Sequence, residues 1–401
     1  MFYSKSSKLR NWTKYILYKI YNRKPYQLKN VNSIYELGGN GLETFFGYYD
    51  KTPFSLNNSF VLGMKLKINS LKSLKIGYFD LNKDNIFYEV GTSESRSWQL
   101  GTRLQWYPQN ENEIICYNKM VGGQYGSVLQ NIKTKKIEEQ YYCPIFDISN
   151  DGTYAVSLNF SRLHRLRPGY GYRNLPDFTE SQLRPENDGI YLLNLKNSNK
   201  SLIISLNSIC KLKPKRSMEK AEHYFNHLSF SPNGKRFLFL HLWINNKKRF
   251  SRLITSDIYG NNLYVLEDSI NMSHYAWKSE NQVLAHTSAK PFGTKFYLYE
   301  DLKAKKILVG EGFLDQSGHP SYSPDGRYLL VDTYPDKYRR QNLKLYTADG
   351  EYIKEIGSFL SPYKFSGENK CDLHPRWDRK GKFICFDSAM NGRRSMYLIE
   401  I

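Results

Sequence analysis

The sequence has few cysteines, and none of them forms a paired motif. The five stand far apart, with no Cys-x-x-Cys spacing between any two: Cys116, Cys143, Cys210, Cys371 and Cys385. A disulfide framework normally uses an even number of cysteines, and zinc ribbons use closely spaced pairs. The sequence therefore argues against both, and we expect a thiol-reducing compartment.

Several common catalytic motifs are also missing. The sequence contains no P-loop and no Gly-x-Ser-x-Gly elbow, and its run Gly38-Gly-Asn-Gly41 lacks a strand–helix context. Residues 1–29 have no uninterrupted apolar core, so they do not resemble a signal peptide. They mix basic with aromatic and aliphatic residues. This pattern fits an amphipathic helix, which either lies on an anionic membrane or packs on the domain.

Acidic residues are outnumbered by basic ones. Lys and Arg total 58 against 38 Asp and Glu, which gives a formal net charge of +20. Such a charge favours an anionic partner, such as nucleic acid, an anionic membrane or an acidic polymer. Because no nucleic-acid-binding module is recognisable, we expect no nucleic acid partner. An acidic oligo- or polysaccharide is the expected partner, and the oligomeric state is left open.

One short pattern recurs seven times along the chain. Its copies begin at residues 51, 103, 145, 227, 274, 319 and 374, mostly 42 to 55 residues apart, with a longer interval after 145. A four-stranded propeller blade takes about 40–50 residues. We therefore predict an all-β, seven-bladed β-propeller over residues 31–401, with an insertion at about 160–225. Residues 1–30 form a separate basic amphipathic segment in this prediction.

The expected strands follow the turns of this repeat. Apolar runs at 236–243, 328–332 and 383–387 indicate buried second strands. The sequence ends on a third strand at 395–401, so a segment near 31–37 is expected to supply the fourth strand and to close the ring. The repeat, with its turn Ser323-Pro-Asp-Gly, resembles the TolB-like propeller blade over about residues 45–401.

Four histidines occupy one position of the repeat: His227, His274, His319 and His374. Each stands three residues before an aromatic residue. A propeller brings equivalent positions together, so we expect the four imidazoles to converge. A single histidine that faces the central channel of a propeller usually has its hydrogen bonds satisfied within the protein and no further role. Four in register favour a metal or catalytic site.

Basic residues are expected around the same face. Lys51 and Arg103 stand at the equivalent position in two other copies. Arginines and tyrosines of the insertion and of nearby loops are candidate substrate-binding groups: Arg162, Arg165, Arg167, Tyr170, Tyr172, Arg249, Arg340 and Arg393. Arg103, Arg165 and Arg167 could clamp a carboxylate, and Tyr170 or Tyr172 could stack on a sugar or act as an acid. The alternative is that these charged loop side chains are simply solvated and bind no ligand.

The motif Gln316-Ser-Gly-His319-Pro-Ser321, with His274 one blade earlier, resembles the metal site of oligogalacturonate lyases. The resemblance implies a divalent ion, usually Mn²⁺, held by Gln316, His319 and His274. The family has a second histidine where this sequence has Ser321, and His374 could take its place. The resemblance also implies that His227 is the catalytic base, with His223 as the weaker candidate.

These observations predict a metal-assisted lyase that acts by β-elimination on an acidic, uronate-containing glycan. Its predicted catalytic residues are His227, Arg103 and Tyr170. Asp332, Tyr334 and Asp387, at second-strand ends, could orient the imidazoles or merely cap strands. A non-catalytic propeller that binds an acidic glycan or a partner protein is the alternative, and another sugar enzyme of capsule or exopolysaccharide production is a third. We expect a cytoplasmic protein, peripheral to the inner membrane.

Overall fold

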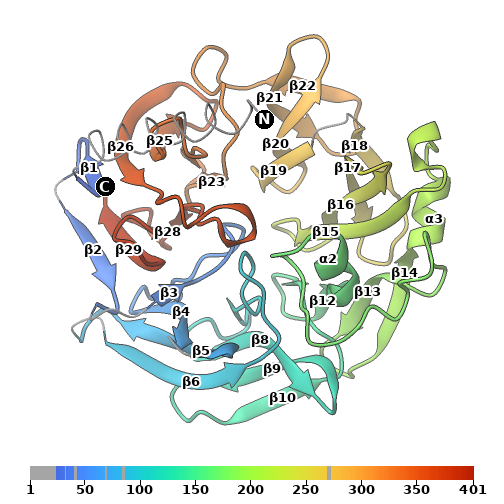
Figure 1. Cartoon of the computed structure of the whole chain (residues 1–401), viewed down its shortest axis with the longest axis horizontal. Helices are drawn as coiled ribbons and strands as arrows, with labels where there is room; N and C mark the ends of the chain where they lie inside the picture. Colours follow the sequence, from blue (N-terminus) through green and yellow to red (C-terminus); the bar gives the residue numbers. More distant parts are fainter. Residues whose placement is uncertain (1–23, 32, 40–42, 68–69, 84–85, 269–271) are drawn as a thin grey trace, which may run out of the picture.

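The protein is a seven-bladed β-propeller, as the repeat predicts. The computed structural model describes residues 24–31, 33–39, 43–67, 70–83, 86–268 and 272–401. Seven antiparallel sheets are arranged radially around one centre, and the chain runs around the ring from blue to red in Figure 1. The predicted helix near the start of the chain falls mostly on residues 1–23, outside the described residues.

The first three blades carry strands β3 to β14. Blade 1 contains β3 (Glu43–Phe45), β4 (Phe60–Lys67), β5 (Ser70–Asp80) and β6 (Phe87–Ser93). Blade 2 contains β7 (Gln105–Trp106), β8 (Ile114–Val121), β9 (Gln124–Asn131) and β10 (Ile137–Tyr141). Blade 3 contains β11 (Asp147–Ile148), β12 (Tyr154–Ser157), β13 (Gly189–Asn194) and β14 (Lys200–Ser205).

The remaining four blades complete the ring. Blade 4 contains β15 (Glu222–Phe230), β16 (Arg236–Asn245), β17 (Lys248–Asp257) and β18 (Tyr264–Glu267). Blade 5 contains β19 (Met272–Trp277), β20 (Gln282–Ala289), β21 (Gly293–Glu300) and β22 (Lys305–Leu308). Blade 6 contains β23 (Pro320–Tyr322), β24 (Tyr328–Asp332), β25 (Arg340–Thr347) and β26 (Tyr352–Leu360), and blade 7 contains β27 (Arg376–Trp377), β28 (Phe383–Ser388) and β29 (Ser395–Glu400).

The ring closes where the sequence predicts. Strand β2 (Ile34–Leu37) pairs antiparallel with β29 and is the fourth strand of blade 7. It covers an edge that would otherwise expose unpaired backbone groups. Strand β1 (Tyr26–Leu28) was not anticipated: it pairs with β26 as a fifth strand of blade 6. The end of the segment predicted as 1–30 is therefore part of a blade.

The recurring serine closes the turn between the first two strands. The Ser323 hydroxyl donates to the Asp325 carboxylate at 2.6 Å and accepts the N–H of Tyr328 at 3.0 Å. Ser149 and Ser231 make the equivalent pairs of bonds with Asp151 and Asn233 and with the following strands. Because both partners are fixed by the spacing, the Ser-Pro-Asp-Gly motif specifies this turn.

Tryptophans in the first strands bond each blade to the one before it. In each case the indole N–H donates to a backbone carbonyl two residues after the repeat position of the preceding blade: Trp106 to Pro53 at 2.9 Å, Trp277 to Ser229 at 3.3 Å and Trp377 to Ser321 at 2.9 Å. This explains the tryptophan that follows the repeat position by three residues in these three copies. A buried indole N–H needs a partner, and the neighbouring blade provides it.

Short helices lie in the insertion and the linkers. Helix α2 (Phe160–Leu166) follows β12, with the Asn159 side chain accepting the N–H of Arg162 at its start. Helix α3 (Leu206–Lys211) follows β14, and two 3₁₀ turns are η1 (Arg216–Met218) and η2 (Gly367–Asn369). Within the described parts of the chain, every helix is too short or too polar to cross a membrane.

Candidate functional site

Three of the four repeat-position histidines are in contact around the centre of the propeller. The ring centroids of His274 and His319 lie 4.1 Å apart, and those of His319 and His374 lie 4.4 Å apart. His227 joins them through Tyr48, whose ring stacks on His227 at 4.6 Å and meets His374 at 4.8 Å. All four imidazoles are buried. Equivalent positions of four successive blades thus build one cluster.

The Asp332 carboxylate orients the middle of this cluster. It accepts the backbone N–H of His319 at 2.7 Å, and its two oxygens lie 2.9 and 3.0 Å from His319 Nδ1. It also accepts the backbone N–H of His374 at 3.1 Å. An ionised carboxylate can only accept hydrogen bonds, so Nδ1 of His319 carries its proton and Nε2 carries a lone pair.

Gly318 makes this contact possible. A Cβ at this position would lie 1.8 Å from the backbone oxygen of Asp332, which is far inside van der Waals contact. The Ser-Gly-His part of the motif therefore has a steric reason. Only glycine lets the chain pass close enough for His319 to reach the Asp332 carboxylate with both its backbone and its ring.

His374 is fixed in the same way on the other side. Its Nδ1 lies 2.8 Å from the carbonyl oxygen of Gly47, which can only accept, so Nδ1 donates and Nε2 is the free base. The Nε2 atoms of His319 and His374 are both buried and have no hydrogen-bond partner. Two lone pairs held in a buried site, each with its opposite ring nitrogen bonded to an oxygen, are what metal-binding histidines show.

A carboxylate that the sequence analysis missed completes this group. Nitrogen atoms of His319 and His374 and an oxygen of Asp372 all lie within 4.8 Å of one another. Asp372 also forms an ion pair with Lys370 at 2.5 Å. Imidazole and carboxylate ligands suit Mn²⁺ and other first-row divalent ions. The residues present therefore fit a divalent metal, and Asp372 offers a carboxylate oxygen beside the two imidazoles.

His274 lies at the edge of the cluster. Its Nε2 is 3.0 Å from the Tyr334 hydroxyl and its Nδ1 is 3.4 Å from the Ser317 hydroxyl. Both hydroxyls can donate or accept. Burial lowers the pKa of His227, His274 and His374 well below the ordinary value, so these rings are neutral near pH 7. Neutral imidazole is the form that binds metal or accepts a proton.

His227 borders the cluster next to the insertion. Its Nε2 is 3.4 Å from the Tyr48 hydroxyl, and its Nδ1 is buried without a partner. Tyr170 approaches its ring at 5.6 Å, and the Arg167 guanidinium packs over Tyr170 at 4.1 Å. The predicted base and the predicted acid are therefore neighbours. Tyr48 was not anticipated, since it precedes the first repeat position and carries no motif of its own.

Two residues of the family motif lie differently. Gln316 is exposed, and it borders a small cavity that Asp332 and Thr333 also line. Ser321, which stands where the family has a histidine, is half-buried in β23, and its carbonyl accepts the Trp377 indole N–H.

Lys51 and Arg103 form ion pairs within the protein. Arg103 donates from both terminal nitrogens to the Asp50 carboxylate, at 3.1 and 2.8 Å, and from Nε to the Phe146 carbonyl at 2.8 Å. Lys51 pairs with Asp147, whose second oxygen accepts the N–H of Phe230. These contacts join blades 1, 2, 3 and 4. Arg103 is buried, and its guanidinium nitrogens are bonded to Asp50 and to the Phe146 carbonyl.

The arginines and Tyr172 of the insertion also have protein partners. Arg162 is buried and donates to backbone carbonyls of His223, Thr179 and Gln182. Arg165 bonds two carboxylates, those of Asp177 and Glu222. Tyr172 stacks on Phe160, and its hydroxyl accepts from Asn118. These side chains hold the insertion in shape. Arg167 is the insertion arginine that lies beside the histidines.

The three loop arginines lie further out. Arg249 is exposed on β17. Arg340 is buried and donates to the carbonyls of Lys24 and Pro25, so it holds the start of the described chain against blade 6. Arg393 pairs with Glu36 of β2 at 2.5 Å and supports the closure. Asp387, a candidate for orienting an imidazole or capping a strand, forms ion pairs with Arg376 and Arg394.

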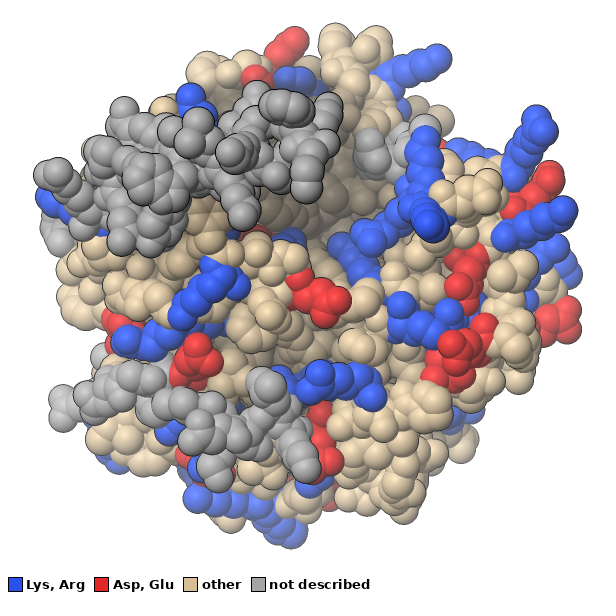
Figure 2. Space-filling model, in the orientation of Figure 1, with Lys and Arg blue, Asp and Glu red and all other residues tan. Residues whose placement is uncertain are grey.

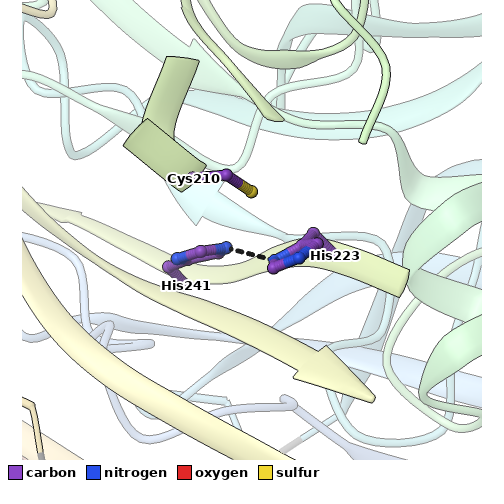
Figure 3. Close-up of side chains that lie close together, drawn as sticks. All are labelled: Cys210, His223 and His241. Atoms are coloured by element: carbon purple, nitrogen blue, oxygen red, sulfur yellow. Dashed lines mark hydrogen bonds between the residues drawn. The ribbon is translucent and has the colours of Figure 1, made fainter. Parts of the chain in front are cut away.

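A second group of possible ligands comes from α3 and blade 4, and its ring nitrogens already have hydrogen-bond partners. Cys210, His223 and His241 lie close together (Figure 3). Arg252 Nε donates to His241 Nδ1 at 3.0 Å, so His241 Nε2 donates to His223 Nδ1 at 2.9 Å, and His223 Nε2 donates to the Met218 carbonyl at 3.1 Å. Every ring nitrogen is used, and burial raises the pKa of the Cys210 thiol to about 11. This group does not fit a metal.

The face that carries α2 and the loop before β27 is hollowed near its middle. Figure 2 shows this face, with basic side chains at the edge of the hollow and acidic ones among them. Lys370 places its ammonium 4.8 Å from the Tyr334 ring, beside His274. Cationic groups at the opening of a buried site attract anionic ligands.

Fold and site together define a propeller with a histidine-rich centre. No protein-family pattern matches the sequence, and no curated protein sequence matches it. Among solved structures, an oligogalacturonate lyase in complex with manganese is similar with a TM-score of 0.66, at 12% identity over 94% of this chain and 96% of that chain. An oligogalacturonate lyase from Vibrio parahaemolyticus gives 0.63, at 8% identity over 94% and 96%. At these identities the likeness establishes the fold.

Proposed function

We propose that this protein is a metal-assisted lyase that cleaves an acidic, uronate-containing glycan by β-elimination. One observation carries the proposal: the buried Nε2 atoms of His319 and His374 lack partners, while their Nδ1 atoms are bonded to Asp332 and Gly47. This arrangement prepares both rings to bind a cation. The likeness in fold to two oligogalacturonate lyases supports the same reading.

The metal would be held by His319 and His374, with Asp372 and His274 beside them. A divalent ion, Mn²⁺ in this proposal, supplies a Lewis acid that neutralises the uronate carboxylate and makes the C5 proton more acidic. Lys370 and Arg167 add positive charge next to the histidines and would help to bind that carboxylate. In this proposal Gln316 and Arg103 have no direct contact with substrate.

His227 would act as the base. Its unpartnered Nδ1 takes the proton from C5, the C5–H electron pair becomes the C4=C5 double bond, and the C4–O bond breaks. The departing oxygen must receive a proton. Tyr48 has its hydroxyl beside His227 and would supply it, while Tyr170 packs against both residues. The products are an unsaturated uronate and a shortened glycan, so the step needs no oxidant.

The substrate class follows from charge and surroundings. The net charge of +20 and the cations at the site favour a polyanionic glycan. All five cysteines are buried and free, which suits a reducing compartment. We place the enzyme in the cytoplasm, in the metabolism of capsule or exopolysaccharide, with residues 1–29 as a contact to an anionic membrane surface.

The test is an elimination assay. The protein is incubated with 4-linked uronate oligosaccharides and Mn²⁺, and the ultraviolet absorbance of the unsaturated product is followed. We expect product with wild type, and a loss of at least about 100-fold with His227→Gln, since general base catalysis contributes about 10²–10⁴-fold. Arg327→Ala, an exposed change in a turn of blade 6, is the control.

Two results would contradict this proposal. The first is the absence of product across a panel of polyuronates together with no bound metal by elemental analysis. The second is glycan binding without turnover that survives both His227→Gln and His274→Ala, which would favour the non-catalytic glycan-binding alternative.

A further inference from the structure

A cavity of about 560 Å³ lies beside the histidine cluster and has no role in the proposed chemistry. Its walls come from four parts of the chain: β3, the loop after β6, α2 with the insertion that follows it, and the loop before β27. The volume falls in the range of small-molecule pockets, about 300–1,000 Å³. Its lining combines an aromatic ring with both cations and carboxylates.

Trp98 gives the cavity a rigid aromatic wall. Its indole N–H donates to the Lys370 carbonyl at 2.8 Å, and its ring stacks with Phe365 at 6.5 Å. The buried guanidinium of Arg394 packs on it at 5.1 Å and donates to its carbonyl. The ring is therefore fixed before any ligand arrives. Fixed aromatic rings bind the apolar faces of sugars at low entropic cost.

Three cationic side chains line the cavity: Arg96, Arg173 and Lys364. Arg173 and Lys364 form no ion pair with any described residue, although Lys364 lies 5.2 Å from the Phe365 ring. Arg173 lies close enough to Arg96 that, with burial, it lowers the pKa of Arg96. Like charges gathered in one hollow favour an anion between them. Glu43 and Glu368 line the same cavity, and their carboxylates can accept hydrogen bonds from sugar hydroxyl groups.

Two short stretches of chain connect this cavity to the histidines. Gly169 lines the cavity, and the next residue, Tyr170, lies 5.6 Å from the His227 ring. Asn369 lines it too, and Lys370, next in sequence, pairs with Asp372 of the metal group. The cavity therefore adjoins the cluster along one side, through residues that are consecutive in the sequence.

We propose that this cavity is a second subsite, which binds an anionic sugar unit next to the unit that reacts at the histidines. The inference rests on the proposed function and extends it: the acidic glycan is bound at a second unit, outside the histidine cluster. Trp98 stacks on the sugar ring, Arg173 and Lys364 bind its carboxylate, and the reacting unit lies over His227.

Calorimetric titration in the presence of a chelator tests this without turnover. The probes are galacturonate and its 4-linked trisaccharide, and the proteins are wild type, Trp98→Ala, Arg173→Ala and the control Arg327→Ala. We expect the trisaccharide to bind wild type more tightly than the monosaccharide does. Trp98→Ala and Arg173→Ala each weaken trisaccharide binding by about tenfold, which corresponds to about 1.4 kcal/mol. Binding of the monosaccharide stays unchanged in both variants.

The outcomes separate the two proposals. Arg173 is exposed, so Arg173→Ala does not threaten the fold. If this variant binds the trisaccharide as tightly as wild type does, the subsite proposal is overturned, even if the enzyme is an active lyase. Length-dependent binding that is lost in both variants supports the subsite even if no elimination product ever forms. No binding of the trisaccharide to wild type overturns the subsite outright.

Discussion

His319 and Asp332 are joined twice, once through the backbone N–H of His319 and once through its Nδ1, at 2.7 and 2.9 Å. His319 immediately precedes β23, and Asp332 is the last residue of the neighbouring strand β24. The same carboxylate also holds the backbone of His374. One side chain thus sets the position of two imidazoles from neighbouring blades.

Asp332→Asn is expected to weaken metal binding by about 10–100-fold, the usual effect of removing such a supporting group. The amide keeps the shape but no longer fixes the proton on His319 Nδ1. Calorimetric titration with Mn²⁺ measures the change. Asp325→Asn, an exposed aspartate of the turn in the same blade, serves as the control and should bind metal as wild type does. Equal affinity in both variants would contradict the role of Asp332.

Arg103→Met is expected to lower the free energy of unfolding by about 3–5 kcal/mol, because it leaves the Asp50 carboxylate buried without its partner. The double variant Asp50→Leu/Arg103→Met should recover part of this loss, since it removes both charges. Urea unfolding followed by fluorescence measures each variant. A loss below about 1 kcal/mol would show that the pair does not hold the centre of the propeller together.

Leu37→Ala is expected to destabilise the protein by about 2–5 kcal/mol, the usual cost of truncating a buried leucine. Leu37 is fully buried on β2, opposite Met396 of β29. Tyr35→Ala is the matched control on the same strand, where the side chain is 48% exposed, and it should cost little. Similar thermal unfolding of both variants would argue against the closing role of β2.

Stability should fall as the pH drops from about 6.5 towards 4. Burial lowers the pKa of His223 to about 4, and burial with the charge of Arg252 lowers the pKa of His241 well below its ordinary value. In the unfolded chain both take up protons near pH 6.5, whereas in the folded protein they stay neutral, so acid favours unfolding. Chemical denaturation across this range measures the slope. His223→Phe/His241→Leu should reduce that slope, and an unchanged slope would contradict the assignment.

Much of the fold could be predicted from the sequence because its determinants are local. The serine turn fixes its own partners within five residues, as Ser323 does with Tyr328. The seven copies of the repeat leave little freedom in the number of blades. The pairing of β2 with β29 followed from the missing fourth strand. Strand β1 could not be predicted, because three residues carry no pattern that indicates which blade they join.

The site could be predicted only in part. The register of the four histidines was visible because a repeat converts sequence position into position in space. Asp372 and Tyr48 lie in loops with no repeat of their own, so only the folded chain brings them to the cluster. Arg103 was predicted as a catalytic residue from its repeat position, and Arg162 as a substrate-binding residue from its place in the basic insertion. Their buried partners, Asp50 and the carbonyls around α2, cannot be recognised from composition.

The most direct test of the account is where a metal binds. A crystal of the protein soaked in Mn²⁺ and measured for anomalous scattering should show one strong peak, within about 2.0–2.3 Å of the Nε2 atoms of His319 and His374. Asp372 should lie on the same ion. No peak there, or a peak at Cys210, His223 and His241 in its place, would contradict the assignment of the histidine cluster as the catalytic centre.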